Sequence, residues 1–221
     1  MRFNSDQSKV SIWCLASIAA VPLIMTLGNS MLIPVLPILE KKVSISSFQS
    51  SLIITSYSVA SILLIPIAGY LSDRFGRKMI LLPSLAITFI GGLVSGFASW
   101  KMSDPYMVII IGRIIQGIGS AGAFPIILPL VGDLYKDDDE ASACLGIVET
   151  SNTFGKVLSP ILGAALALWI WYIPFFSISV FSLISFLMVL FFIKVPKKKD
   201  EPPKLKDFLQ QVKKIFHTDG R

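Results

Sequence analysis

Six long apolar segments are the feature that most constrains the fold of this sequence. Each is close to, or longer than, the roughly 20 residues that a helix needs to cross the hydrocarbon of a bilayer. The linkers between them are too short to build a polar shell around six buried helices. The sequence therefore predicts an all-α membrane protein with six transmembrane helices, at about residues 12–37, 48–70, 79–98, 106–131, 142–167 and 170–193.

Composition and charge agree with a multi-pass membrane protein. Hydrophobic residues make up 53% of the chain and charged residues 15%, against roughly 25% charged residues in ordinary soluble domains. The net charge of +6 comes from lysines and arginines in the loops and the tail, which is a topology signal and not a sign of nucleic-acid binding. With the amino terminus inside, the outer loops hold only Lys41, Lys42 and Lys101. We expect a plasma-membrane protein with both ends of the chain in the cytoplasm.

The first and fourth segments end in similar proline-bearing stretches. These are "MLIPVLPIL" at residues 31–39 and "AFPIILPLV" at residues 123–131. Each segment opens a group of three helices, and interrupted helices at matching positions are typical of the inverted repeats of secondary transporters. The pattern predicts two inverted three-helix repeats, although prolines are also simply tolerated in membrane helices.

The chain divides into two regions, a six-helix membrane domain over residues 1–194 and a connector over residues 195–221. The connector begins as a polar, proline-bearing linker. It continues with an apolar stripe opposite lysines, formed by Leu205, Phe208, Leu209, Val212, Ile215 and Phe216. This pattern fits a basic amphipathic helix on the cytoplasmic leaflet, and it equally fits a solvated connector.

The turn between the second and third segments reads "GYLSDRFGRKMIL", residues 69–81. Gly69 would let two helices approach closely, and Gly76 can adopt a backbone angle that other residues avoid. Asp73 would lie just before the next helix, where the amide dipoles favour a carboxylate. The three bases of the turn, Arg74, Arg77 and Lys78, would hold it on the cytoplasmic side. The simpler interpretation is an ordinary basic hairpin.

Three ionisable residues fall well inside apolar segments: Arg113, Glu149 and Lys156. Such groups are costly in a membrane, so each is a functional candidate, although Arg113 could instead extend to the outer surface. Glu149 and Lys156 are seven residues apart, which places them on one helix face about 10 Å apart. We expect them to line a central cavity at two depths. Glu149 is then the candidate proton carrier, and Lys156 supplies a neighbouring cation or binds an anionic substrate group. The alternative is that both only pair with other helices for structure.

The fifth segment carries regularly spaced small residues around a proline: Gly146, Gly155, Ser159, Pro160, Gly163 and Ala164. Small residues let membrane helices pack closely, and proline bends a helix. The spacing predicts a kinked, closely packed helix that can rock between two access states.

Three of these patterns together resemble the major facilitator superfamily. The turn matches the family signature G-x-L-S-D-R-x-G-R-K between the second and third helices. The fourth segment matches the motif R-x-x-Q-G-x-G through Arg113, Gln116, Gly117 and Gly119. The fifth resembles the antiporter motif G-x8-G-x3-G-P-x2-G-G, with Ser159 and Ala164 in place of two glycines.

The resemblance implies roles for these residues. In the family the turn acts as a cytoplasmic latch that contacts helix ends of the opposite half and helps to hold the outward-open state. Asp73, Arg74, Arg77 and Lys78 take those roles here, and Asp133 is expected to join them. In proton-coupled members the arginine matching Arg113 is implicated in proton movement. Asn29 lies near where many relatives keep an acid, which removes a second candidate proton site. The motif on the fifth helix marks export by exchange.

Members of the superfamily usually have twelve helices in two similar halves. The resemblance therefore implies half of a twelve-helix fold, with the carboxy-terminal six-helix half as the missing partner. The leading interpretation is the amino-terminal half of a proton-coupled antiporter that exports drugs or other small amphiphiles, as in multidrug resistance. By itself this half is expected not to transport.

Two other functions stay open. The cargo could be an anionic or zwitterionic metabolite, a siderophore or a lipid. Alternatively, the chain could be a membrane scaffold or receptor without transport. The sequence has no nucleotide-binding loop, redox pair or metal cluster, so we expect no enzyme activity, no cofactor and no metal. The acidic run at residues 136–140 is interpreted as a solvated loop, and Cys14 and Cys144 as small apolar packing residues.

Overall fold

The computed structural model describes residues 12–193 of the chain, and the connector helix expected beyond them lies outside the described residues. Within this range the protein is helical and contains no strand. The elements are α1 Ile12–Ser30, the 3-10 turn η1 Ile33–Val35, α2 Leu36–Val43, α3 Ser47–Phe75, α4 Arg77–Lys101, α5 Tyr106–Ala121, α6 Phe124–Leu134, α7 Asp138–Trp169 and α8 Ile173–Phe192.

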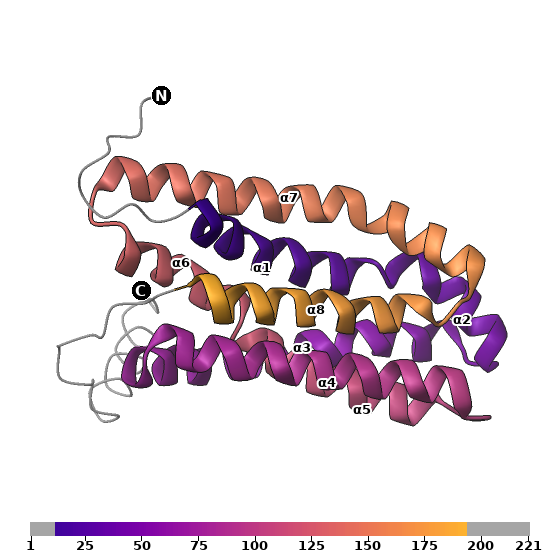
Figure 1. Cartoon of the computed structure of the whole chain (residues 1–221). Coiled ribbons are helices and arrows are strands. Elements are labelled where there is room, and N and C mark those ends of the chain that lie inside the picture. The colour runs from indigo at the N-terminus through magenta and orange to yellow at the C-terminus, as the bar shows by residue number, and fades with distance from the viewer. Residues whose placement is uncertain (1–11, 194–221) are drawn as a thin grey trace, which may run out of the picture.

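These elements form six spans that run back and forth along one bundle (Figure 1). Within residues 12–193, five stretches are both long and apolar enough to cross a membrane: Ile12–Val43, Ser47–Phe75, Arg77–Lys101, Tyr106–Leu134 and Ile173–Phe192. The sixth span is α7, whose 32 residues are long enough. Its acidic first turn, Glu149 and Lys156 make it more polar than the other five spans. The predicted all-α membrane fold is confirmed.

The helices extend beyond the apolar segments that predicted them. The second and third segments were expected to end at residue 70 and to start at residue 79, and both bounds are wrong, because α3 continues to Phe75 and α4 begins at Arg77. Gly76 alone makes the turn, with the positive φ of 101° that the sequence predicts for it. α7 begins at Asp138 because the Asp137 carboxylate accepts hydrogen bonds from the backbone N–H groups of Asp139 and Glu140. Polar residues of this kind extend helices past the hydrocarbon without adding to the apolar signal.

The first and fourth spans are both broken, as their prolines predict. In the first, α1 stops at Ser30 and the chain passes through η1 into α2. In the fourth, α5 stops at Ala121 and α6 starts at Phe124. Prolines occupy the first turns of η1, α2 and α6, where the missing N–H group costs no hydrogen bond.

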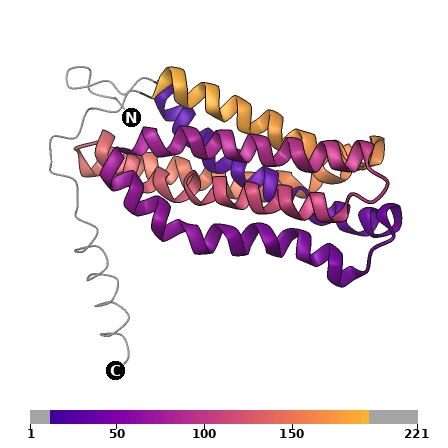
Figure 2. The same ribbon diagram turned by 90° about the horizontal axis from the view of Figure 1, so that it is seen from below.

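The packing of the spans has the symmetry of two inverted repeats. α1 packs against α7 and α8, α5 packs against α3 and α4, and α4 packs against α8. Exchanging the first three spans with the last three converts α1–α7 into α5–α3 and α1–α8 into α5–α4, and it leaves the α4–α8 pair unchanged. Figures 1 and 2 show the resulting bundle, with both ends of the described chain at the end that carries the α3–α4 turn.

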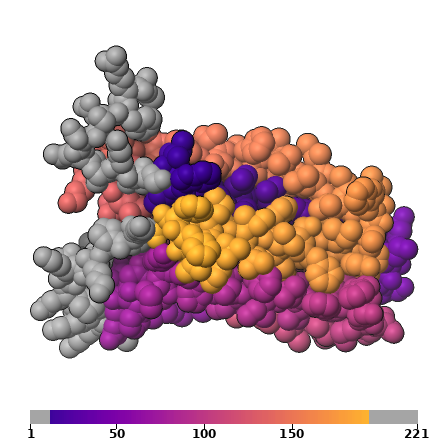
Figure 3. All heavy atoms as spheres, in the orientation of Figure 1, coloured from indigo at the N-terminus to yellow at the C-terminus, as the bar shows by residue number. Residues whose placement is uncertain are grey.

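The helices differ in how much of their surface is buried within the described chain. One face presents α7, α8 and α4, with the first part of α1 visible between α7 and α8 (Figure 3). Cys14 and Cys144 are free and buried in a core cluster that includes residues of α1, α4, α6, α7 and α8. In contrast, only 6% of the most apolar part of α3 is buried within the chain. Large apolar side chains such as Ile62 and Leu63 are exposed along α3.

Candidate functional site

A cavity of about 510 Å³ opens between the first, second, fourth and fifth spans. Its volume lies within the usual range for small-molecule sites. Neither α4 nor α8 contributes to its wall. The wall consists of Met25, Thr26, Asn29 and Ser30 of α1, Tyr57, Ser61 and Ile65 of α3, Ser120 of α5, Phe124 and Pro125 of α6, and Glu149, Asn152 and Lys156 of α7.

Arg113 lies directly behind this wall and is fully packed. Arg113 is only 1% exposed. Nε donates a hydrogen bond to the Ile53 carbonyl oxygen at 3.1 Å, Nη2 donates to Asn29 Oδ1 at 2.7 Å, and Nη1 donates to Gln116 Oε1. The interpretation in which Arg113 extends to the outer surface is therefore wrong, because its donors are used inside the bundle.

The charge of Arg113 is compensated by neutral groups. Its guanidinium carbon lies 4.5 Å from the centre of the Tyr57 ring, a cation–π distance. The Tyr57 hydroxyl in turn lies 2.6 Å from Ser120 Oγ. Among the described residues no carboxylate pairs with Arg113, since both salt bridges found there involve Arg77. Asn29 and Tyr57 thus separate a fixed positive charge from the cavity.

Glu149 and Lys156 both face the cavity from α7. Asn152 Nδ2 donates to the two carboxylate oxygens of Glu149 at 3.2 and 3.3 Å. Neither Glu149 nor Lys156 forms an ion pair with any residue in 12–193. Within this part of the chain, the structure gives no support to the alternative in which they pair with other helices.

Small residues of α7 bring it into close contact with α1. A Cβ atom at Gly155 would lie 2.9 Å from the Leu23 carbonyl oxygen, and one at Gly163 would overlap the Met31 carbonyl oxygen. Ser159 Oγ donates to the Leu27 carbonyl oxygen at 2.8 Å. Gly146 differs, because no neighbouring atom of the described chain lies within 4 Å of its Cβ position. Pro160 lies inside α7, and the helix continues through it.

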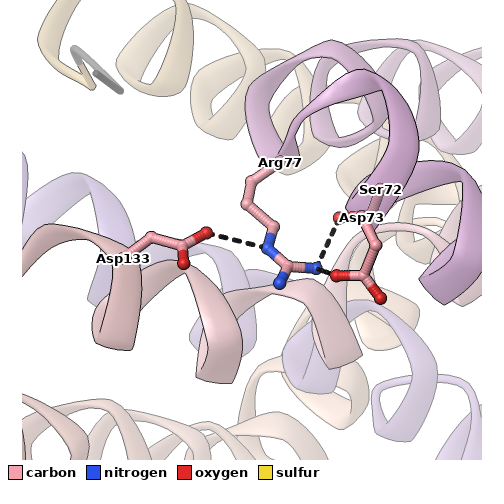
Figure 4. A network of polar contacts seen from close by, with 4 residues as sticks. All are labelled: Ser72, Asp73, Arg77 and Asp133. Carbon is pink, nitrogen blue, oxygen red and sulfur yellow. Dashed lines mark hydrogen bonds and ion pairs between the residues drawn. The ribbon is translucent and has the colours of Figure 1, made fainter. Parts of the chain in front are cut away.

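At one end of the bundle, Arg77 joins three helices (Figure 4). Its Nη1 lies 2.5 Å from Asp73 Oδ1, at the end of α3. The same nitrogen donates to Ser72 Oγ at 3.1 Å, and Nε donates to Asp133 Oδ2 of α6 at 3.0 Å. Asp133 therefore lies among the charges of the turn.

Two details of the turn differ from the expectation. Asp73 belongs to the last turn of α3 and does not precede the next helix as a cap, because α3 extends to Phe75. Gly69 makes no close helix contact within the described chain, since its Cβ position has no neighbour within 4 Å.

The other two bases of the turn also have partners in this chain. Arg74 donates to the Tyr70 hydroxyl at 3.2 Å and lies over the Phe75 ring. Lys78 Nζ donates to the carbonyl oxygens of Leu190 and Ile193 at 2.8 and 2.7 Å. Lys78 thereby satisfies free carbonyl groups at the end of α8, where a cation is favoured.

Six polar residues of the wall were not among the candidates from the sequence: Thr26, Ser30, Tyr57, Ser61, Ser120 and Asn152. Asn152 was accessible to sequence reasoning, because it follows Glu149 by three residues and so shares its helix face. Thr26, Tyr57 and Ser120 come from other helices, and no spacing connects them to α7. No group of His, Cys, Asp or Glu side chains in the described part of the chain could hold a metal ion.

Comparisons with known proteins fit this arrangement. The model of the Major Facilitator Superfamily matches residues 18–219. The bacillibactin exporter of Bacillus subtilis is 61% identical over 93% of this chain and 51% of its own length. The triacylglyceride transporter of Mycolicibacterium smegmatis is 34% identical over 71% of this chain and 27% of its own length.

Solved structures share the fold at low sequence identity. The human organic anion transporter MFSD10 superimposes with a TM-score of 0.73 at 20% identity, covering 92% of this chain and 53% of that protein. A D-xylose-proton symporter gives a TM-score of 0.67 at 21% identity, covering 95% of this chain and 53% of that protein.

The chain spans about half the length of the bacillibactin exporter and of these two structures. The Bacillus and Mycolicibacterium relatives are named as an exporter and a transporter. The family model, the interrupted first and fourth spans, the charged turn and the polar cavity lead to one conclusion: this chain belongs to the major facilitator superfamily.

Proposed function

We propose that this chain is the amino-terminal half of a proton-coupled exporter whose cargo is a siderophore such as bacillibactin. The observation that carries the proposal is the 61% identity to the bacillibactin exporter over 93% of the chain. It favours the alternative of an anionic or zwitterionic cargo over drugs or other small amphiphiles.

The charges around the cavity support an anionic cargo. Lys156 is exposed on the wall and has no ion-pair partner among the described residues. Arg113 places a second positive charge directly behind Asn29 and Tyr57. Glu149 is the one carboxylate on the described wall. A wall of this kind attracts an anion, and a lysine ammonium binds it through charge-assisted hydrogen bonds.

Glu149 is our candidate for the proton carrier. An exchanger needs a group that can take up a proton from one side of the membrane and release it to the other, and a carboxylate on the cavity wall meets this requirement. We propose that Glu149 carries a proton in one access state and that the cavity holds the anion in the other. Arg113 and Gln116 hold the wall between α1, α3 and α5 in place.

The charged turn and the small residues of α7 support alternating access. We infer that the turn faces the cytoplasm, with both chain termini on that side of the plasma membrane. Asp73 is 44% and Asp133 30% exposed in their side chains although both bind Arg77. They therefore have room for further partners on the carboxy-terminal half. We propose that Gly69 and Gly146, with open space at their Cβ positions, also face that half.

The cargo is tested with Lys156→Met in the complete transporter, which joins this chain to its carboxy-terminal half. We expect efflux of bacillibactin from everted vesicles or loaded cells to fall about tenfold, because a hydrogen bond to a charged group is typically worth about 1.5–3 kcal/mol. Efflux of a cationic dye, if any, should not fall. Lys156→Arg is the control and should retain most of the bacillibactin efflux.

Two results would contradict the proposal. One is unchanged bacillibactin efflux in Lys156→Met. The other is a complete transporter that exports the cationic dye and not bacillibactin, which would restore the drug interpretation.

A further inference from the structure

We propose that Asn152 is the positioning residue for Glu149: it holds the carboxylate at the cavity wall and connects it to α1 through Thr26. The inference rests on the proposed role of Glu149 as proton carrier. It adds two residues, Asn152 and Thr26, to the coupling machinery, and it identifies the helix pair that senses the state of the carboxylate.

The side chain of Asn152 is held from both sides. The residue is 5% exposed. Its Nδ2 reaches both oxygens of Glu149 at 3.2 and 3.3 Å. Its Oδ1 accepts a hydrogen bond from Thr26 Oγ1 of α1 at 2.5 Å. A threonine hydroxyl can donate to the amide oxygen, and a carboxylate can accept only from the amide nitrogen. The two partners therefore fix which end of the amide points to Glu149.

Protonation of Glu149 changes this chain of hydrogen bonds. An ionised carboxylate offers two acceptor oxygens to the Asn152 amide, whereas the protonated group has one fewer acceptor and gains a donor. The change reaches Thr26 through a single side chain. Thr26 lies on the part of α1 that contacts α7 closely, next to the approach of Gly155 to the Leu23 carbonyl oxygen.

Few other charges face Glu149. The titratable groups on the described cavity wall are Glu149 and Lys156 of α7 and Tyr57 of α3, and the wall residues of α1, α5 and α6 include none. Arg113 lies behind Asn29 and Tyr57. The other side-chain bond from α7 to α1 joins Ser159 to the Leu27 carbonyl oxygen and does not involve Glu149. Asn152 and Thr26 are thus the direct polar link from the carboxylate to α1.

The experiment uses the complete transporter in proteoliposomes, with bacillibactin as the probe and two readouts. The first is net transport driven by a proton gradient. The second is counterflow, the exchange of labelled for unlabelled bacillibactin at equal pH, which needs cargo binding and rocking but no net proton transfer. A residue that only supports the fold would affect both readouts, whereas a residue that positions the proton carrier affects the first.

Thr26→Val and Asn152→Ala are the test variants. We expect proton-driven transport to fall about tenfold in Asn152→Ala, which loses a hydrogen bond to a charged group, and about fivefold in Thr26→Val, which loses one to a neutral amide. Counterflow should stay within about twofold of the original in both. Thr26→Val keeps the shape of the side chain and provides the test even if Asn152→Ala does not fold. Thr26→Ser keeps the hydroxyl and should retain proton-driven transport.

Thr150→Val is the matched control on α7. The Thr150 side chain is exposed, and its hydroxyl bonds only to the Gly146 carbonyl oxygen of its own helix, at 2.7 Å. We expect both readouts to be unchanged.

The possible failures can be told apart. If Glu149→Gln retains proton-driven transport, the proposed carrier is wrong. If Glu149→Gln loses it while Thr26→Val and Asn152→Ala keep it, only the positioning role is overturned. An equal loss of counterflow and proton-driven transport in Thr26→Val would also overturn that role, because the residue would then act through packing alone.

Discussion

At the scale of single residues, five ionisable groups of the described chain fall into two classes. Arg113, Arg77 and Lys78 have all or most of their donors occupied by partners within the chain. Lys156 has no hydrogen bond or ion pair in the described part, and Glu149 has only the Asn152 amide. The residues of the first class hold the helices together and fix the electrostatic potential inside the bundle. We propose that the second class serves the cargo and the protons.

The Arg77 contacts can be tested by their effect on stability. We expect Arg77→Met to destabilise the complete protein by about 1–3 kcal/mol, because it leaves Ser72, Asp73 and Asp133 without their shared donor. Asp133→Asn should cost less, about 0.2–1 kcal/mol, as is usual for a partly exposed ion pair. Thermal unfolding in detergent would measure both changes. The control is Arg74→Met on the exposed side of the same turn. An equal loss of stability there would show that the contact of Arg77 with three helices adds no stability beyond that of another arginine of the turn.

At the scale of the helices, close approach depends on a few positions where α7 has no side chain. Gly155 faces the Leu23 carbonyl group of α1 and Gly163 the carbonyl group of Met31, just after α1 ends, and Ser159 adds a hydrogen bond between them. These contacts hold α1 and α7 side by side along the cavity. The geometry of the wall therefore depends on the α1–α7 contact.

This dependence predicts opposite results for two glycine substitutions. Gly163→Ala should lower the stability by about 1–3 kcal/mol, the usual cost of overpacking, because the new methyl group would overlap the Met31 carbonyl oxygen. Gly132→Ala should be neutral or slightly stabilising, because its Cβ position is open and alanine favours the helix. Melting temperatures of the two variants would decide the matter, and equal values would mean that α1 and α7 do not pack as described.

The sequence predicted the helices better than their ends or their contacts. Apolar length located all six spans, and the prolines at residues 34, 37, 125 and 129 identified the two broken ones. The ends were displaced because Asp137 and Gly76 determine them through capping and backbone geometry. Glu149 and Lys156 were recognised as candidates because a charge in an apolar segment stands out. Thr26 and Tyr57 were not, since a single polar side chain carries no signal until another helix is brought next to it.

At the scale of the whole molecule, the described chain forms the wall of a polar cavity. Four spans line it, and α4 and α8 stand away from it. The chain spans about half the length of the relatives named above. We propose that a second six-helix half closes the cavity and provides the other side of the access pathway. The exposed apolar residues of α3 and the open Gly69 and Gly146 positions are then available for contact with that half or with lipid.

The most direct test of this account is bacillibactin export measured in cells that lack their own exporter. Cells producing the complete transporter are compared with cells producing its Glu149→Gln variant and with cells producing residues 1–221 alone. The account predicts export by the complete transporter that responds to the proton gradient, and none above background in the other two. Export by residues 1–221 alone, or gradient-driven export by the Glu149→Gln variant at the original rate, would contradict it.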